Sequence, residues 1–181
     1  TIRLLCCIIL SFYIVACASP RQVNAYSRAG FDFTRVQTYS IYDRNSSFSD
    51  LQNLSDSTRN TIEFSIERAL ESSGFIYKNY QEADIIVTYY MIEANILDLQ
   101  NYNQEVQFCG YCLRVDKTQR KKLTKSYRPG SLVLDVINAK NQSSVWRSVY
   151  PLALKEKDNS QEVEEKINNA IHIMMQGYPS A

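Results

Sequence analysis

The sequence predicts an α+β fold: a two-layer sandwich with a mostly antiparallel sheet and two helices packed on one face. Two segments with apolar residues at helical spacing, near 55–74 and 158–177, predict the helices. Segments rich in β-branched and aromatic residues, chiefly 83–96 and 131–154, predict the strands. Together they give the order β-α-β-β-β-β-α, which suits two packed layers. A chain of 181 residues with 45% hydrophobic content is long enough for one such domain.

The start of the chain predicts export. The run "LLCCIILSFYIVA", residues 4–16, carries no charge and follows Arg3. It is too short to span a membrane, which takes about 20 apolar residues, but it suits the apolar region of a secretory signal. Because the chain begins with Thr rather than Met, we expect the basic start of this signal to be incomplete. The ending Ile-Val-Ala16-Cys17 resembles the lipobox of bacterial lipoproteins.

This resemblance implies a location. A peptidase would cut between Ala16 and Cys17, and the Cys17 Sγ would carry diacylglycerol. Two or more acyl chains anchor a protein stably, at about 0.8 kcal/mol for each buried CH₂. Ala18 follows the cysteine, and in enteric-type lipoproteins this favours the outer membrane. We therefore expect a signal at 1–16, a lipidated tether at 17–25 and a single domain at 26–181, facing the periplasm of a Gram-negative bacterium.

The first strand is expected at 31–43, "FDFTRVQTYSIYD", with an irregularity near its fourth or fifth residue, where the apolar residues change parity. A Ser-, Asn- and Asp-rich loop then leads to the first helix. Ser55 or Ser57 can cap this helix, and Gly74 stands where a C′ glycine ends one. Its apolar stripe consists of Ile62, Ile66, Ala69 and Leu70.

The remaining strands follow in order. The segment 83–96, "ADIIVTYYMIEANI", is apolar on both parities and predicts a central strand. The segment 104–116 alternates more loosely and predicts another strand, and 131–154 predicts a hairpin. In the hairpin, one strand presents Leu132, Leu134 and Val136, and the other presents Trp146, Tyr150 and Leu152.

The last helix begins near residues 158–160, whose side chains can cap it, and ends at Gly177 and Pro179. Its residues at helical spacing are Val163, Ile167, Ala170, Ile171 and Met174. This regular spacing predicts that one face of the helix packs on the sheet.

Four motifs carry a family resemblance. The first strand has an aromatic-Asp-Phe group before Thr38-Tyr39, and "ADIIVTYY" is an Asp-hydrophobic strand. The hairpin "GSLVLDVINAKNQSSVWRS" has a Gly-x-Leu start and a Val-Trp-Arg, and the chain closes on Tyr178-Pro179. Together they resemble a bacterial lipoprotein family known as domain of unknown function 4136. Asn138 and Ser148 depart from it, since the family usually has Asp and Gly there. The family has no established activity, so the resemblance implies a fold and a location.

Cys109 and Cys112, in "FCGYC", are the two cysteines left to the domain once the signal and anchor are removed. A closed zinc site needs four ligands and the chain has one histidine, His172, so no metal and no cofactor are predicted. Basic residues follow the pair and could stabilise a thiolate, but the segment predicts strand and turn rather than the βαβ setting of a thioredoxin-like site. We expect a structural disulfide, formed in an oxidising compartment. A periplasmic thiol–disulfide oxidoreductase is the alternative.

The run 114–128, "RVDKTQRKKLTKSYR", has seven basic residues and one acid. These residues are Arg114, Lys117, Arg120, Lys121, Lys122, Lys125 and Arg128. We expect a solvated hairpin loop, as is usual for such runs. The alternative is contact with an anionic partner, such as lipid head groups or lipopolysaccharide phosphates, at about 1 kcal/mol per basic residue.

Charge and motifs limit the function. The chain has 20 Lys and Arg against 19 Asp and Glu, and removing Arg3 with the signal balances them, so no nucleic-acid partner is predicted. No G-x-S-x-G, Walker or Rossmann pattern occurs. We expect a non-catalytic lipoprotein, attached to the membrane through Cys17, that binds another envelope component. The alternatives are the oxidoreductase and a lipid- or lipopolysaccharide-handling module that uses the basic run.

Overall fold

A computed structural model of the chain describes residues 24–42, 54–93 and 96–179. The expectations for residues 1–23, namely the signal, cleavage after Ala16 and lipidation of Cys17, lie outside the described residues. A single six-stranded sheet forms the centre of the described part, in the order β1-β6-β5-β4-β2-β3. Its strands are β1 (Asn24–Ser27), β2 (Thr38–Ile41), β3 (Ile76–Tyr77), β4 (Ile85–Met91), β5 (Ser131–Asn138) and β6 (Ser143–Pro151).

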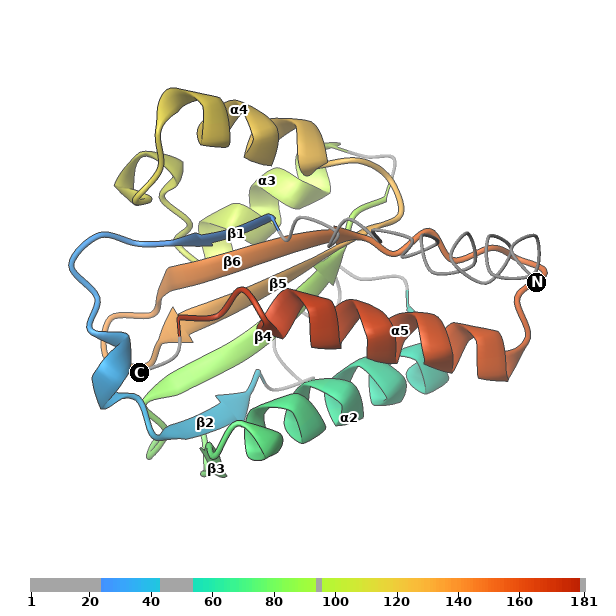
Figure 1. The fold of residues 1–181 in the computed structure, drawn as a ribbon, viewed down its shortest axis with the longest axis horizontal. Helices are drawn as coiled ribbons and strands as arrows, with labels where there is room; N and C mark the ends of the chain where they lie inside the picture. Colours follow the sequence, from blue (N-terminus) through green and yellow to red (C-terminus); the bar gives the residue numbers. More distant parts are fainter. Residues whose placement is uncertain (1–23, 43–53, 94–95, 180–181) are drawn as a thin grey trace, which may run out of the picture.

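The sheet is mixed. The pairs β1–β6, β6–β5 and β5–β4 are antiparallel, whereas β4–β2 and β2–β3 are parallel. Helices cover both faces of this sheet (Figure 1). On one face lie α2 (Asp56–Ser72) and α5 (Ser160–Met175); on the other lie α3 (Ile96–Glu105) and α4 (Lys117–Ser126). The α+β class is confirmed, but the prediction of two helices on one face missed the second helical layer.

The first apolar cluster contains the residues that periodicity predicted. Ile62, Ile66 and Leu70 of α2 are buried with Ile167, Ile171 and Met174 of α5 against Leu132, Leu134, Val136 and Trp146 of the hairpin. The two helices begin at side-chain caps: Ser55 accepts from Thr58 N–H, and Asn159 forms a capping box with Glu162. Gly74 follows α2 with a φ of +88°, the left-handed C′ conformation that favours glycine. In this layer, the capping residues and the pattern of buried side chains therefore both favour the same two helices.

The second apolar cluster lies on the other face of the same strands. Ile86 and Tyr90 of β4 pack there with Leu99 and Tyr102 of α3 and with Leu123 of α4. Every residue of β4 from Ile85 to Tyr90 is therefore buried, which explains why its sequence does not alternate. The prediction of a central strand is confirmed.

Three predicted segments differ from the structure. Of the strand predicted at 31–43, Phe33–Arg35 form a 3₁₀ turn capped by Asp32, and only Thr38–Ile41 form a strand. Residues 104–116 form no strand; they hold the end of α3 and a second 3₁₀ turn, Gly110–Cys112. Asn24 and Ala25, assigned to the tether, are the first residues of β1. Alternation over a few residues does not distinguish a strand from such compact turns.

A polar clamp joins β2 to β4. The Asp84 Oδ2, just before β4, accepts hydrogen bonds from the backbone N–H of Gln37 at 3.1 Å and of Thr38 at 2.9 Å. The Thr38 hydroxyl donates to the same oxygen at 2.8 Å and accepts from the Asp84 N–H at 3.0 Å. Burial raises the pKa of Asp84, but these hydrogen bonds to the ionised carboxylate outweigh it and leave the pKa below its ordinary value. The clamp thus sets the register of the parallel pair.

We expect Asp84→Asn to destabilise the domain by about 1 kcal/mol at neutral pH, because the clamp is charge-assisted but largely exposed. Since folding lowers the pKa of Asp84, its contribution is complete above the unfolded-state value of about 3.9 and disappears as pH falls through the lower folded-state value. Urea unfolding of both proteins from neutral pH to pH 3 measures the difference. A difference that stays constant down to the lowest pH would contradict this assignment.

Candidate functional site

The basic run predicted as a solvated loop is a helix. The Asp116 Oδ1 accepts from Gln119 N–H at 2.7 Å, and the Gln119 Oε1 accepts from Asp116 N–H at 3.0 Å, a capping box that starts α4. Leu123 is the one buried residue within α4 and faces the sheet cluster. The loop prediction was wrong because one apolar residue alone gives no helical periodicity in the sequence. The cap and the good helix formers are enough to form the helix once Leu123 is buried.

The exposed side of α4 concentrates positive charge. Lys117, Lys121 and Lys125 follow one another at four-residue spacing and are exposed, so they share one face. Lys122 is exposed beside them, and Arg114 and Arg128 are exposed at either end. Arg120 is half-buried, with its guanidinium carbon 5.1 Å from the centre of the Tyr111 ring. The seven predicted basic residues thus lie together on and around one helix.

A hollow of about 380 Å³ opens beside the carboxyl end of this helix. Cationic residues, two prolines and small residues line it, and no acidic residue does. The lining residues are Asn24, Lys122, Lys125, Ser126, Arg128, Pro129, Gly130, Ser131, Pro151 and Ala153. Segments from β1, α4, β5 and β6 therefore build a single surface depression of one charge sign.

Cys109 and Cys112 are joined by a disulfide that closes the 3₁₀ turn before α4. The Cys112 carbonyl accepts from Ala29 N–H at 3.0 Å, and Arg114 N–H donates to the Ser27 carbonyl at 2.8 Å, so the turn is tied to the end of β1. Neither cysteine lies in the first turn of an α-helix, since α4 begins at Lys117. The helix-dipole setting that lowers thiol pKa values is therefore not present at this pair.

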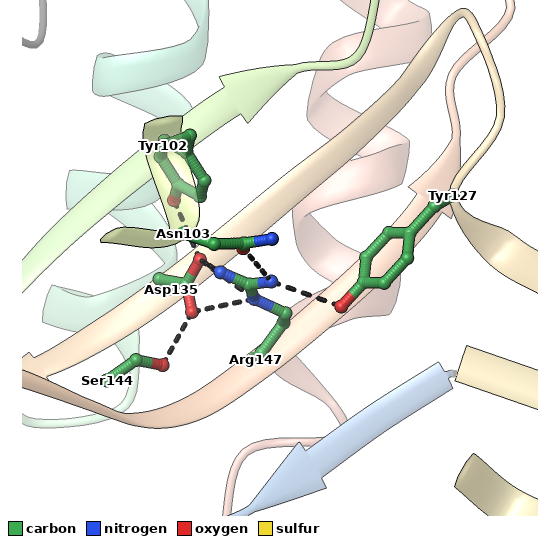
Figure 2. A network of polar contacts seen from close by, with 6 residues as sticks. All are labelled: Tyr102, Asn103, Tyr127, Asp135, Ser144 and Arg147. Carbon is green, nitrogen blue, oxygen red and sulfur yellow. Dashed lines mark hydrogen bonds and ion pairs between the residues drawn. The ribbon is translucent and has the colours of Figure 1, made fainter. Parts of the chain in front are cut away.

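A buried polar network, drawn in Figure 2, links β5 and β6 to α3 and to Tyr127, just after α4. Arg147 of β6 and Asp135 of β5 are cross-strand partners, and their side chains are fully buried. Arg147 Nε lies 2.9 and 3.0 Å from the two Asp135 carboxylate oxygens, and Nη2 lies 2.8 Å from Oδ2. Tyr102 and Ser144 hydroxyls each donate to Asp135 at 2.7 Å. The carboxylate is thus fully supplied with donors.

The same arginine reaches the second helical layer. Arg147 Nη1 donates to Asn103 Oδ1 of α3 at 2.7 Å and to the Tyr127 hydroxyl, just after α4, at 3.1 Å (Figure 2). Its guanidinium carbon lies 3.6 Å from the centre of the Phe108 ring, next to the disulfide, a cation–π contact. Burial alone would lower the pKa of Arg147, but the Asp135 carboxylate outweighs it and the pKa is raised. A permanent buried charge therefore connects the sheet, α3, the disulfide turn and α4.

A family model described as "Domain of unknown function (DUF4136)" matches residues 22–180. The chain belongs to this family. The family predicted from the four motifs is therefore confirmed.

Other comparisons concern solved structures. A DUF4136 family protein from Bacteroides thetaiotaomicron is 14% identical with a TM-score of 0.49, over 82% of this chain and 92% of that one. A PDZ domain protein from Parabacteroides distasonis is 13% identical with a TM-score of 0.49, over 85% of this chain and 34% of that one. No curated protein matches the chain.

The structure also shows what surrounds the remaining candidate groups of this DUF4136 domain. His172 is exposed on α5, with its Nε2 3.1 Å from Gln176 Nε2. Within the described ranges, no three His, Cys, Asp or Glu side chains gather as metal ligands would. No helix in those ranges is long and apolar enough to cross a membrane.

Sequence reasoning missed the Asp135–Arg147 pair, although a signal for it exists. Asp135 interrupts the apolar run "LVLDVI", and Arg147 follows Trp146 in the strand opposite. Both residues lie on the opposite side of their strands from the predicted core face. With only one helical layer expected, that side of the sheet would face solvent. A charge flanked on both sides by apolar residues of the same parity, as Asp135 is by Val133 and Ile137, indicates a second buried face.

We expect Asp135→Leu and Arg147→Met each to lower the free energy of unfolding by about 3–5 kcal/mol, because each leaves the other buried charge without its partner. The double variant should lose at least about 1 kcal/mol less than the sum of the two, since it removes both charges together. Urea denaturation of the four proteins measures this coupling. As a control, Arg35→Met, at an ion pair that is largely exposed, should cost under about 1 kcal/mol. Additive losses at Asp135 and Arg147 would refute the coupling.

Proposed function

We propose that this protein is a non-catalytic lipoprotein of the cell envelope, anchored through acyl chains on Cys17 and facing the periplasm from the outer membrane. The observation that carries the proposal is the position of Cys17. It ends a lipobox-like "IVAC", and the family match begins five residues later, at residue 22. An anchor so placed attaches a whole domain to the membrane through a short connection.

The character of the domain supports a binding role. The network of ionisable groups around Asp135 and Arg147 is buried and its members satisfy one another, which suits structural support rather than contact with a substrate. Six exposed cations instead lie together on and around α4, namely Arg114, Lys117, Lys121, Lys122, Lys125 and Arg128. Exposed charge of one sign favours association with an anionic component of the envelope.

Replacing Cys17 tests the anchor. We expect Cys17→Ala to abolish incorporation of a clickable fatty acid and to prevent the thioether-linked attachment, since no other residue is predicted to accept the lipid. Gel fluorescence after labelling in cells measures this. The matched control is Cys6→Ala with Cys7→Ala, which changes two cysteines of the predicted signal and should leave labelling intact. Labelling that persists in Cys17→Ala would overturn the proposed anchor.

The cysteine pair separates the binding role from thiol–disulfide catalysis. We expect Cys109→Ser with Cys112→Ser to lower the free energy of unfolding by about 2 kcal/mol or less, the chain-entropy value for so short a loop. After reduction, both thiols should be alkylated with a pH dependence near the ordinary thiol pKa of about 8.5. Alkylation rates measured from pH 5 to pH 10 provide the test. A thiolate that forms well below pH 8.5 would favour the oxidoreductase.

A further inference from the structure

The hollow beside the end of α4 has the features of a site for an anionic group. Lys122, Lys125 and Arg128 line it together, and its lining contains no acid. Arg128 Nε already donates to the Lys125 carbonyl at 3.0 Å, which fixes one cation at the rim. Within the described part of the chain, no ion pair engages the ammonium groups of Lys122 and Lys125. Two lysines and the remaining guanidinium donors are therefore free to bind a ligand.

The electrostatics favour an anion despite the direction of the helix. The carboxyl end of a helix carries a partial negative charge equivalent to about half an elementary charge. Three cations in the same lining outweigh this partial charge. Lysine and arginine are also the side chains that bind phosphate oxygens in proteins, arginine through paired donors.

The apolar part of the lining indicates what accompanies the anionic group. Pro129, Pro151 and Ala153 present hydrocarbon surface beside the cations. A small inorganic ion would leave this surface in contact with water. A phospholipid headgroup with its glycerol would instead place its phosphate at the cations and its hydrocarbon against the prolines.

The predicted anchor lies close to this hollow in the chain. Asn24, at the start of β1, lines the hollow together with residues from the end of α4 and the start of β5. Asn24 is the seventh residue after Cys17, and seven extended residues span at most about 25 Å. The hollow is thus held near the leaflet that contains the acyl chains, where a short connection raises the effective concentration of headgroups.

We propose that this hollow binds the phosphate of an anionic phospholipid in the membrane that carries the anchor. The inference rests on the proposed lipid anchor. Binding would hold the carboxyl end of α4 against the membrane surface. It would also orient the domain, so that α2 and α5, on the far face of the sheet, are turned away from the lipid.

Differential lysine labelling tests the proposal on the mature lipidated protein in vesicles. One vesicle set is phosphatidylcholine alone, and the other contains phosphatidylcholine and phosphatidylglycerol in equal parts. We expect an uncharged acylating reagent to modify Lys122 and Lys125 several-fold more slowly on the anionic vesicles, as measured by mass spectrometry, and high salt to abolish the difference. The labelling rates of Lys117 and Lys121 show whether the whole helix is attracted to the anionic vesicles. Lys78 and Lys140, exposed on other parts of the domain, report general effects.

Each outcome is decisive. Slowing confined to Lys122 and Lys125 supports the headgroup site, whereas equal slowing at Lys117 and Lys121, or none, overturns it. A third arm adds inorganic phosphate or glycerol phosphate to the phosphatidylcholine vesicles. Slowing by these soluble phosphates without slowing on anionic vesicles would assign the hollow to a free phosphate and overturn the lipid. Failure of the protein to sediment with either vesicle set would overturn the anchor itself, independently of the labelling.

Discussion

The ion pair between Asp135 and Arg147 is the constraint on which the second helical layer depends. Helices α3 and α4 have ten residues each, a length at which isolated helices are marginal in water. Among the side chains of these two helices that the structure describes, the buried apolar ones are Leu99, Tyr102 and Leu123, so their apolar contribution is small. Arg147 supplies directed contacts to Asn103, Phe108 and Tyr127, one for each part of this layer. Because the buried charge of Arg147 cannot be left unpaired, its contacts fix the positions of these two short helices and of the disulfide turn between them.

The opposite layer is built on a different principle. Helices α2 and α5 are long and capped, and each presents a continuous apolar stripe to the sheet. Their position follows from burial of apolar area, which is strong but not directional. This is why periodicity and capping residues predicted them, along with β4 and the hairpin, to within a few residues. The same method could not detect α3 and α4, since their register depends on polar partners from distant strands.

The family motifs gain a physical meaning from the structure. Thr38 and the aspartate of "ADIIVTYY" form the clamp between β2 and β4. The aromatic-Pro ending places Tyr178 among the rings of Phe33, Phe75 and Trp146. The hairpin motif contains both members of the buried ion pair. For the candidate site, the sequence predicted the charges but not the helix or the hollow, because Asn24, Lys122 and Pro151 come together only once β1 pairs with β6 and α4 returns to β5.

In the second helical layer, the charged residues on the inner side support the structure, and those on the outer side are exposed at the surface. Arg147 is balanced within the core by Asp135, and Asp116 is engaged in the capping box of α4. Neither acid is placed to form an ion pair with the exposed lysines. The positive charge of Lys121, Lys122 and Lys125 therefore remains available at the surface. This exposed positive charge is what the proposed contact with an anionic phospholipid requires.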